Sequence, residues 1–390
     1  LLRRKLEKLV EETGLHVPLD VPVENLAVGE RQRVEILKVL ARDVEVLILD
    51  EPTSVLTPVE TAELFKFLRN LRDQGKAVIF ITHKLKEALA VTDRIVVLRR
   101  GRVAGEVKTP NATAGELARL MIGVEITPGH RPVELALEGE RQRTEARGPK
   151  GEPALVVKAL KVRSDTGELA VRDLSFELYP GEILGIAGVE GNGQSELVEA
   201  ICGLRRVEAG SVELLGKNVT NHPPTELYRL GLGHIPEDRW KHGVILSFTM
   251  AENSILGLQR ERRFSTAGIL RAWAVRRHAA KLVQEFGIQT AGLSAPVKSL
   301  SGGNQQKLIV ARELSKDPKV IIAAQPTRGL DIGAAQFIRD LLLRLREEGR
   351  AILLVSADLD EVLALSDRVA FMYEGTFTGV ARPAELTAET

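Results

Sequence analysis

Residues 300–307 read LSGGNQQK, and residues 26–33 read LAVGERQR, a weaker copy of the same pattern. The two stretches lie 274 positions apart. The same separation, without insertion or deletion, pairs Glu51 with Gln325, Pro52 with Pro326, Thr53 with Thr327, His83 with Ala357, Asp93 with Asp367 and Gly105 with Gly379. Solenoid repeats are about 20–50 residues long, so this period is too long for one. The chain is therefore predicted to hold two copies of one domain.

Composition limits the classes of protein to consider. The 390 residues are 44% apolar and 27% charged, enough for two or three globular domains. The longest apolar runs, such as 351–355, are far shorter than the roughly 18 residues of a membrane span, so any membrane association is expected only through partners. Cys202 is the only cysteine, which excludes a disulfide framework and fits a reducing cytosol. A net charge of +1 gives no reason to expect nucleic acid as a ligand.

In the first copy, the apolar spacing predicts alternating helices and strands. The run Val46–Leu49, within a predicted strand over 44–49, is continuously apolar, which is typical of a parallel strand buried on both faces. A helix and a second strand follow it, which makes a βαβ unit. The predicted elements are helices 1–14, 30–41, 58–73 and 113–122, strands 44–49 and 77–82, and a hairpin over 94–107.

Residues 123–153 break this pattern. The segment holds Pro128, Pro132 and Pro153 among many charges, which is typical of a linker. We therefore predict domains over 1–122 and 154–390. In the second copy the predicted elements are strands 154–162, 170–178, 182–187, 320–324 and 352–356, helices 196–202, 269–286, 299–314 and 333–348, and a hairpin through 374–375.

A glycine-rich loop, GVEGNGQS at 188–195, joins a predicted strand to a helix. Phosphate-binding loops read GxxxxGK[ST], because glycines let backbone N–H groups approach phosphates, the lysine reaches the β and γ phosphates, and the hydroxyl ligates magnesium. Gly188, Gly193 and Ser195 match, but Gln194 replaces the lysine. The amide forgoes charge-assisted hydrogen bonds of about 1.5–3 kcal/mol each, so we expect weakened nucleotide binding. The alternative is a turn that binds no ligand.

Two carboxylates, Asp50 and Glu51, directly follow the apolar residues 46–49 in the stretch VLILDEPT at 46–53. Asp50 can hold Mg²⁺, and Glu51 can orient and deprotonate a water molecule. His83 ends the neighbouring predicted strand and would lie at the same sheet edge, within reach of a γ-phosphate. We therefore predict Asp50 as a metal ligand and Glu51 and His83 as catalytic residues, the alternative for His83 being a purely structural role.

The second copy has lost these groups but keeps a different one. At the matching positions stand Ala324, Gln325 and Ala357, so hydrolysis is not expected there. Ser301, Gly302 and Gly303 begin a predicted helix, although each interior glycine costs about 1 kcal/mol relative to alanine. A hydroxyl and exposed N–H groups at a helix start favour a phosphate clamp. The first copy has Ala27 and Val28 in place of Ser301 and Gly302.

These motifs resemble those of ABC transporter ATPases. LSGGNQQK resembles the signature motif, VLILDEPT the Walker B motif, ITHK at 81–84 the H-loop, and GVEGNGQS a degenerate Walker A. With HIPEDR at 234–239 and AAQPTRGLD at 323–331, the chain looks like the double-cassette ATPases of bacterial importers of simple sugars and nucleosides, and AAQPTRGLD favours the nucleoside branch. The resemblance covers essentially the whole chain. It implies an α/β fold of tandem P-loop NTPase cassettes, the first one incomplete.

The resemblance also implies the ligands and their residues. In that family two cassettes face each other head to tail, and each ATP with its Mg²⁺ lies between the Walker A motif of one cassette and the signature motif of the other. The resemblance therefore implies one consensus site and one degenerate site. Asp50 and Ser195 are the implied metal ligands, and Glu237 stands at the Q-loop position. The implied nucleotide contacts are Gly188, Gly191, Asn192, Gly193, Gln194, Ser195, Glu196, Leu300, Ser301, Gly302, Gly303, Asn304 and Asp331.

The implied function is ATP binding and hydrolysis to energise an importer of nucleosides or simple sugars. The implied partners are two transmembrane permease subunits and, through them, an extracytoplasmic substrate-binding protein, with the chain peripheral at the cytoplasmic face of the cell membrane. By the 274-residue offset the first Walker A would fall before Leu1, where no initiator methionine stands. We therefore expect an N-terminally truncated chain that is inactive alone, although the full-length protein hydrolyses ATP.

Two other classes of function remain open at this point. A soluble tandem-cassette ATPase that acts on ribosomes or DNA would also carry two signature motifs. The near-neutral charge and the one-sided loss of catalytic groups disfavour it. A nucleotide-binding module without turnover is the other alternative.

Overall fold

The computed structural model describes residues 2–23, 26, 28–42, 44–53, 56, 58–82, 84–99, 101–122 and 151–385. The chain divides into two compact units, 1–136 (unit 1) and 137–390 (unit 2), which are described separately. Residues 123–150 of the predicted linker lie outside the described residues, so the domain boundaries stay a prediction. No helix of the described part is both long and apolar enough to cross a membrane.

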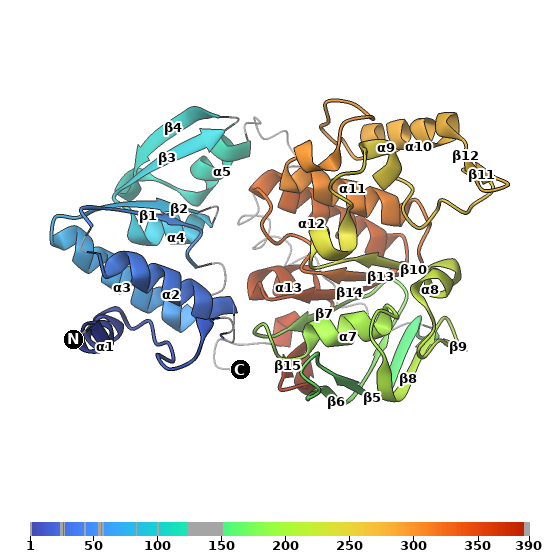
Figure 1. Cartoon of the computed structure of the whole chain (residues 1–390), viewed down its shortest axis with the longest axis horizontal. Coiled ribbons are helices and arrows are strands. Elements are labelled where there is room, and N and C mark those ends of the chain that lie inside the picture. Colours follow the sequence, from blue (N-terminus) through green and yellow to red (C-terminus); the bar gives the residue numbers. More distant parts are fainter. Residues whose placement is uncertain are drawn as a thin grey trace. The chain divides into compact units, whose positions relative to one another are not determined.

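Unit 1 is built around a βαβ unit, as predicted (Figure 1). Strands β1 (Val46–Asp50) and β2 (Ala77–Ile81) are parallel and in register from Val46 opposite Ala77 to Asp50 opposite Ile81. The other elements are α1 (Leu2–Thr13), α2 (Val28–Leu40), α3 (Pro58–Asp73), α4 (Leu85–Val91), the hairpin β3 (Arg94–Arg99) and β4 (Arg102–Lys108), the 3₁₀ turn η2 (Thr109–Asn111) and α5 (Ala114–Ile122).

The prediction that the first strand is buried on both faces is wrong for this unit. Leu47 and Leu49 pack with residues of α2 and α3, such as Ile36 and Leu64. The alternate side chains point to the other face, where Val46 is 54% and Ile48 61% exposed. A continuous apolar run therefore gave the correct element but not its burial.

Unit 2 has a six-stranded sheet of order β10-β13-β14-β7-β15-β16, parallel except for the last strand. Its strands are β7 (Ile183–Ala187), β10 (Leu232–Ile235), β13 (Val320–Ala324), β14 (Ala351–Ser356), β15 (Arg368–Tyr373) and β16 (Thr376–Ala381). Strands β7, β13 and β14 are buried along their whole length, because helices or a second sheet cover both faces.

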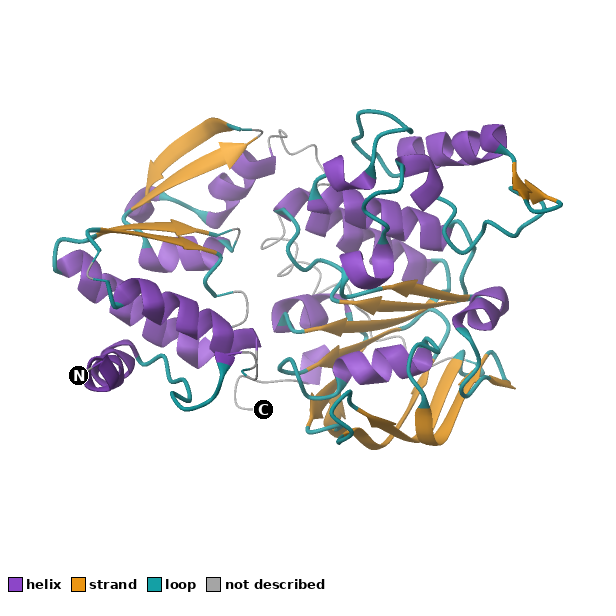
Figure 2. Cartoon of the chain, viewed as in Figure 1, coloured by secondary structure: helices purple, strands orange, loops and turns teal. Residues whose placement is uncertain are grey.

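The second sheet of unit 2 is antiparallel, with order β6-β5-β8-β9 (Figure 2). It comprises β5 (Leu155–Arg163), β6 (Leu169–Leu178), β8 (Val207–Leu214) and β9 (Lys217–Asn218). One core cluster joins this sheet to the parallel sheet around α7 (Gln194–Ile201), and a second lies between the parallel sheet and α12 (Ile332–Glu347).

The remaining elements of unit 2 are mostly helical. They are α8 (Pro224–Leu230), a π-helical turn η3 (Arg239–Gly243), α9 (Met250–Asn253), β11 (Ser265–Thr266), β12 (Ile269–Leu270), α10 (Ala272–Glu285), η4 (Val297–Ser299), α11 (Gly302–Leu314), α13 (Leu359–Leu365) and η5 (Pro383–Glu385).

The helix predicted over 269–286 begins three residues late. Ile269 and Leu270 instead form β12, which pairs antiparallel with β11. The two residues between these strands, Ala267 and Gly268, have φ of 49° and 82°. Positive φ at both central residues is the geometry of a tight hairpin turn, so local turn chemistry overrode the helical period.

Candidate nucleotide sites at the strand ends

The glycine-rich loop of unit 2 connects the end of β7 to α7, and two of its glycines are required by the fold. Gly193 has φ of 101°, and a Cβ there would lie 2.2 Å from the Ala170 carbonyl oxygen. A Cβ on Gly188 would lie 2.5 Å from the Met372 oxygen. Gly191 also has positive φ, but its Cβ position is open. The loop therefore packs its backbone directly against β6 and β15.

Gln194 turns back into this loop. Its Oε1 accepts a hydrogen bond from the Asn192 backbone N–H (3.1 Å), and its Nε2 donates to the Val189 oxygen (3.0 Å). The side chain of Asn192 also donates to Val189 (2.8 Å). Gln194 is 9% exposed, so a buried amide takes the place of an ammonium group. A phosphate would have to compete with Gln194 for the Asn192 N–H.

Ser195, the predicted metal ligand, has a protein partner in this structure. Its Oγ donates to Glu237 Oε2 (2.9 Å), and Glu237 follows β10. Arg328 Nη1 lies 2.8 Å from Glu237 Oε1 and 2.9 Å from Glu190 Oε1. Two carboxylates on one guanidinium leave a formal charge of −1 beside the loop, which opposes a polyphosphate. The sequence placed Glu237 at the Q-loop position, but no spacing signal pointed to Glu190 or Arg328.

Glu196 lies in the first turn of α7 and is partly exposed. A carboxylate is stabilised at a helix N-terminus by the helix dipole. This position places the Glu196 carboxylate beside the loop, and its contact with nucleotide stays a prediction.

In unit 1, Asp50 and Glu51 lie at the carboxyl end of β1. Asp50 is exposed and pairs in register with Ile81 of β2, while Glu51 is partly buried. The Glu51 N–H donates to the Ile81 oxygen (2.9 Å), and Glu51 has φ of 45°. His83 lies outside the described residues, so its catalytic role stays a prediction.

Gln325 of unit 2 repeats the backbone of Glu51. It has φ of 46°, and its N–H donates to the Val355 oxygen (2.7 Å). Non-glycine residues at positive φ are uncommon and cluster at functional sites. Both copies therefore keep the same unusual turn, although only one keeps the carboxylate.

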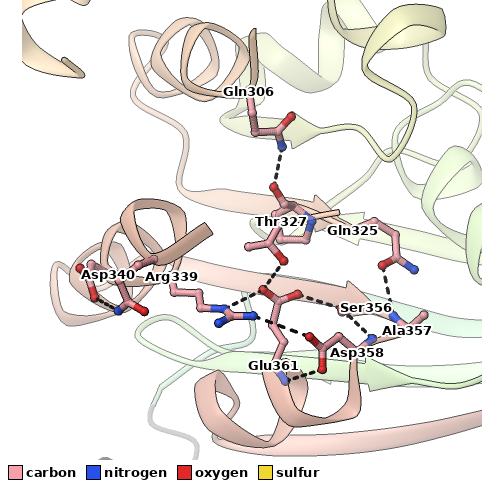
Figure 3. Close-up of polar contacts among 11 residues, drawn as sticks. Gln306, Gln325, Thr327, Arg339, Asp340, Ser356, Ala357, Asp358 and Glu361 are labelled. Atoms are coloured by element: carbon pink, nitrogen blue, oxygen red, sulfur yellow. Dashed lines mark hydrogen bonds and ion pairs between the residues drawn. The ribbon is translucent and has the colours of Figure 1, made fainter. Parts of the chain in front are cut away.

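A buried carboxylate joins the two strand ends in unit 2 (Figure 3). Glu361, at the start of α13, is 1% exposed. It accepts hydrogen bonds from Thr327 Oγ1 (2.6 Å) and Ser356 Oγ (2.8 Å), which follow β13 and end β14. Arg339 of α12 lies 3.1 Å from Glu361 and 3.7 Å from Asp358, and so compensates the buried charge.

Unit 1 has the same bridge at the matching positions. Thr53 Oγ1 donates to Glu87 (2.7 Å), as does Thr82 Oγ1 (3.2 Å). The compensating cation here is Lys84, 3.2 Å from Glu87, instead of an arginine on the preceding long helix. Sequence analysis missed both glutamates, although Glu87 and Glu361 are 274 positions apart and could have been found from the offset.

Two amides fix the loop after β13 in unit 2. Gln325 Oε1 accepts from the Ala357 backbone N–H (3.2 Å). Gln306 Nε2 donates to the Pro326 oxygen (2.8 Å), which ties α11 to the same loop (Figure 3). Gln325, which stands where unit 1 has a carboxylate, thus links the ends of the adjacent strands β13 and β14.

The start of α11 presents an exposed serine. Ser301 is the N-cap, and its Oγ lies 2.8 Å from the Nδ2 of Asn304, which donates to it. Asn304 Oδ1 in turn accepts from the Gln289 N–H (2.8 Å). Because Ser301 Oγ accepts from Asn304, its own proton remains available for an outside acceptor.

The glycines of this motif serve close packing. Gly303 is buried, and a Cβ there would lie 2.8 Å from the Cβ of Ala334 in α12. Asp331 caps α12 by accepting from the Ala334 N–H (2.9 Å). The Gly302 oxygen accepts from Arg239 Nη1 (3.1 Å), and burial lowers the pKa of that guanidinium.

The predicted contacts fall into two separate groups in unit 2. Leu300 is 8% exposed and packs in a core cluster, so its side chain faces inward. The structure brings residues 300–304 together with Asp331. Within the described part of the chain, no hydrogen bond or ion pair joins residues 300–304 directly to residues 188–196.

Comparison with protein families matches residues 2–54 and 171–328 to a family described as ABC transporter. The chain is 43% identical over 387 residues to a nucleoside import ATP-binding protein of Lactococcus lactis, covering 99% of this chain and 74% of that protein. A guanosine import ATP-binding protein of Bacillus subtilis is 40% identical, with 99% and 73% coverage. A glucose import ATP-binding protein of Haloferax volcanii is 41% identical, with 99% and 68% coverage.

Among solved structures, similar folds occur in single cassettes. A nucleotide-free ATP-binding cassette from an ABC transporter aligns with a TM-score of 0.51 at 24% identity, over 59% of this chain and 92% of that one. A dimeric cassette in a post-hydrolysis state bound to ADP and phosphate aligns with a TM-score of 0.51 at 24% identity, over 60% of this chain and all of that one. These similarities concern the fold alone.

Proposed function

Because this chain belongs to the ABC transporter family, we propose that it is the ATP-binding subunit that energises an importer of nucleosides or simple sugars. The observation that carries the proposal is 40–43% identity, over 99% of the chain, to proteins named as nucleoside, guanosine and glucose import ATP-binding proteins. The relative at 43% identity is named for nucleosides, which favours the nucleoside branch. ATP closure and hydrolysis would then drive conformational change in membrane partners.

The residues at the end of β1 suit the catalytic part of this function. Asp50 is an exposed carboxylate of the kind that Mg²⁺ takes, and Glu51 is positioned by a left-handed turn directly after it. Bound Mg²⁺ would neutralise charge on the phosphates. We assign Asp50 to hold the metal, Glu51 to accept the proton of the attacking water, and His83 to donate to the γ-phosphate.

The start of α11 suits the recognition of phosphate. The Ser301 hydroxyl is exposed and keeps a free proton, and the first N–H groups of a 13-residue helix add donors beside it. We assign Ser301, Gly302 and Gly303 to contact nucleotide phosphates. Asn304 holds Ser301 in place through its side-chain amide.

The loop at 188–195 suits weak nucleotide binding without turnover. The loop joins a strand to a helix, as phosphate-binding loops do. However, Gln194 accepts the hydrogen bond of the Asn192 backbone N–H, and Glu190 and Glu237 add negative charge beside the loop. At the strand ends next to it stand Ala324 and Gln325, which supply no base.

The partners follow from the importer function. We propose that transmembrane permease subunits hold the chain at the cytoplasmic face of the membrane, and that an extracytoplasmic binding protein delivers the solute to them. This arrangement requires no membrane-spanning segment in the chain itself.

The test is solute uptake in cells that carry the permease subunits with either the full-length wild-type protein or its Glu51→Gln variant. Labelled guanosine, ribose and glucose distinguish the solute classes. We expect ATP-dependent uptake with the wild-type protein and a loss of about 10²–10⁴-fold with Glu51→Gln, because a general base contributes about that factor. Uptake that is unaffected by the substitution would exclude the proposed role.

A further inference from the structure

The hairpin β11–β12 and helix α10 form a protruding, strongly basic segment of unit 2 (Figure 1). Between Gln259 and Glu285 the sequence has seven arginine or lysine residues and two glutamates, a local charge of +5. The whole chain carries only +1, so the other residues together carry −4. This segment is therefore a concentrated positive region on a chain that is otherwise slightly acidic. We refer to residues 259–285 as the basic arm.

The positive charge of the arm lies on one face of α10. Ala274, Val275, Ala279 and Leu282 are buried against the rest of the unit. The opposite face carries Trp273, Arg276, Arg277 and Lys281, all exposed. These four positions recur at helical spacing, so they form one continuous outer stripe.

The acidic residues of the arm do not cancel this stripe. Glu261 is engaged by Arg263 at 2.6 Å, on the loop before the hairpin. Glu285 is 3.5 Å from Lys281 at the far end of α10. Within the described part of the chain, the only polar contact of the Arg276 side chain is a long one of 3.4 Å to the neutral Ser294. The guanidinium groups in the middle of the stripe are thus not paired with carboxylates in the arm.

Large apolar side chains beside these cations are exposed to solvent. Ile269 is 74%, Leu270 48% and Trp273 64% exposed. The turn through Ala267 and Gly268 holds the two aliphatic residues at the hairpin, directly before α10. Exposed apolar groups of this size beside a basic helix face are typical of a surface with a partner.

The combination favours a lipid surface over nucleic acid or an acidic protein. Cations alone would serve any polyanion, and Trp273 could stack on a base. Ile269 and Leu270 would gain nothing from a phosphate backbone, whereas aliphatic residues and tryptophan insert at the boundary of headgroups and acyl chains. Arginine and lysine beside them pair with anionic headgroups.

We propose that the basic arm binds directly to an anionic phospholipid surface, with Ile269, Leu270 and Trp273 inserted and Arg276, Arg277 and Lys281 on the headgroups. This contact is additional to attachment through permease subunits. It rests on the charge and exposure of the arm alone and does not depend on ATP binding or on the import function.

The test is co-sedimentation of the purified chain, without nucleotide, with vesicles of phosphatidylglycerol and phosphatidylcholine. The variant Arg276→Gln/Arg277→Gln/Lys281→Gln removes three cations of the stripe. The matched control Lys217→Gln/Arg229→Gln/Arg344→Gln removes three exposed cations elsewhere in unit 2. Because each basic residue near an anionic surface changes partitioning about fivefold, we expect the stripe variant to bind about a hundredfold more weakly and the control to stay close to wild type.

Insertion of the apolar side chains into the lipid can be measured separately by tryptophan fluorescence. The chain has two tryptophans, so Trp240→Phe leaves Trp273 as the only one. We expect its fluorescence to shift to the blue with anionic vesicles, and Ile269→Ser/Leu270→Ser to weaken binding without changing the fold.

Three results would overturn the proposal. One is equal binding to pure phosphatidylcholine vesicles, and another is equal weakening by the stripe variant and its control. The third is no vesicle binding together with salt-sensitive binding to a short RNA or to an acidic peptide, which would assign the arm to that class of partner. Because ATP plays no part in this assay, a failed transport test would leave its result unaffected.

Discussion

The carboxyl ends of β1–β2 in unit 1 and of β13–β14 in unit 2 have the same architecture but different chemistry. Both have a non-glycine residue at positive φ directly after the first strand, Glu51 and Gln325. Both tie the two strand ends together through one carboxylate, Glu87 and Glu361. Only unit 1 keeps Asp50 and Glu51. The turn and the bridging carboxylate therefore belong to the fold, whereas the two carboxylates that we propose as metal ligand and base can be lost without disturbing it.

The bridge itself differs in how its charge is compensated. Glu361 is more deeply buried than Glu87, with side-chain exposures of 1% and 11%. Its cation, Arg339, comes from α12, while Lys84 is three residues before Glu87 and is 43% exposed. At the position of Arg339, unit 1 has Phe65. The bridge formed by Glu361 in unit 2 is thus more deeply buried than the bridge formed by Glu87 in unit 1.

The largest difference in stability should come from removing the bridging carboxylates. Glu361→Ala leaves Arg339, whose side chain is only 15% exposed, and two hydroxyls without their acceptor, which should cost about 3–5 kcal/mol. Glu87→Ala should cost about 1–2 kcal/mol, because water reaches Lys84. Both tryptophans and all three tyrosines lie in unit 2, so denaturant unfolding followed by fluorescence reports on unit 2, and hydrogen exchange reports on unit 1.

Glu347→Ala, an exposed site on α12, is the control and should change the stability by less than about 0.5 kcal/mol. Equal losses for Glu87→Ala and Glu361→Ala would show that the two bridges are equivalent and that burial does not decide their strength.

Acid should destabilise unit 2 through His234. Burial lowers the pKa of His234 to about 4, and its Nε2 has no hydrogen-bond partner among the residues that the structure describes. Above about pH 6.5 the side chain is neutral in both the folded and the unfolded chain and has no effect on stability. As the pH falls from about 6.5 to 4, only the unfolded chain gains the proton, so unit 2 should lose up to about 3 kcal/mol.

The measurement is the urea midpoint of the tryptophan signal across this pH range. His234→Leu should flatten the dependence below pH 6.5. A dependence that is unchanged in the variant would assign the effect to other groups.

Restoring the lysine should strengthen nucleotide binding in unit 2 without creating turnover. Gln194→Lys returns a charge-assisted hydrogen bond of about 1.5–3 kcal/mol, so ATP affinity should rise by about 10- to 100-fold in a calorimetric titration. Gln194→Met, which has a similar size and no charge, should not raise the affinity. Equal gains in both variants would mean that loss of the internal amide contacts is the cause, and not the charge.

The smallest effect should come from restoring a carboxylate at position 325. In Gln325→Glu an oxygen can still accept from the Ala357 N–H, so stability should change by less than about 0.5 kcal/mol. Phosphate release should not increase, because Ala324 and Ala357 still supply no metal ligand or histidine. New ATP turnover in this variant would show that the missing base alone separates the two units.

The order of elements could be predicted from the sequence because it depends on local periodicity. The βαβ unit of residues 46–81, the strand–loop–helix around Gly188 and the helix of the LSGGNQQK motif all follow from apolar spacing and turn residues. The hairpin at 265–270 was missed because a two-residue turn interrupted an otherwise helical period. The one-sided burial of β1 was missed because a sequence gives no count of the layers that cover a strand.

The duplication, the family resemblance and the asymmetry between the two copies can all be recognised in the amino-acid sequence, because they depend on residue identity at a constant offset of 274. How the degenerate positions are used becomes visible in the folded chain. Gln194 closes on Asn192, Arg328 joins Glu190 to Glu237, and Glu361 joins two strand ends. The last two contacts join residues distant in sequence, and all three depend on side-chain direction, which neither a periodicity nor a motif records.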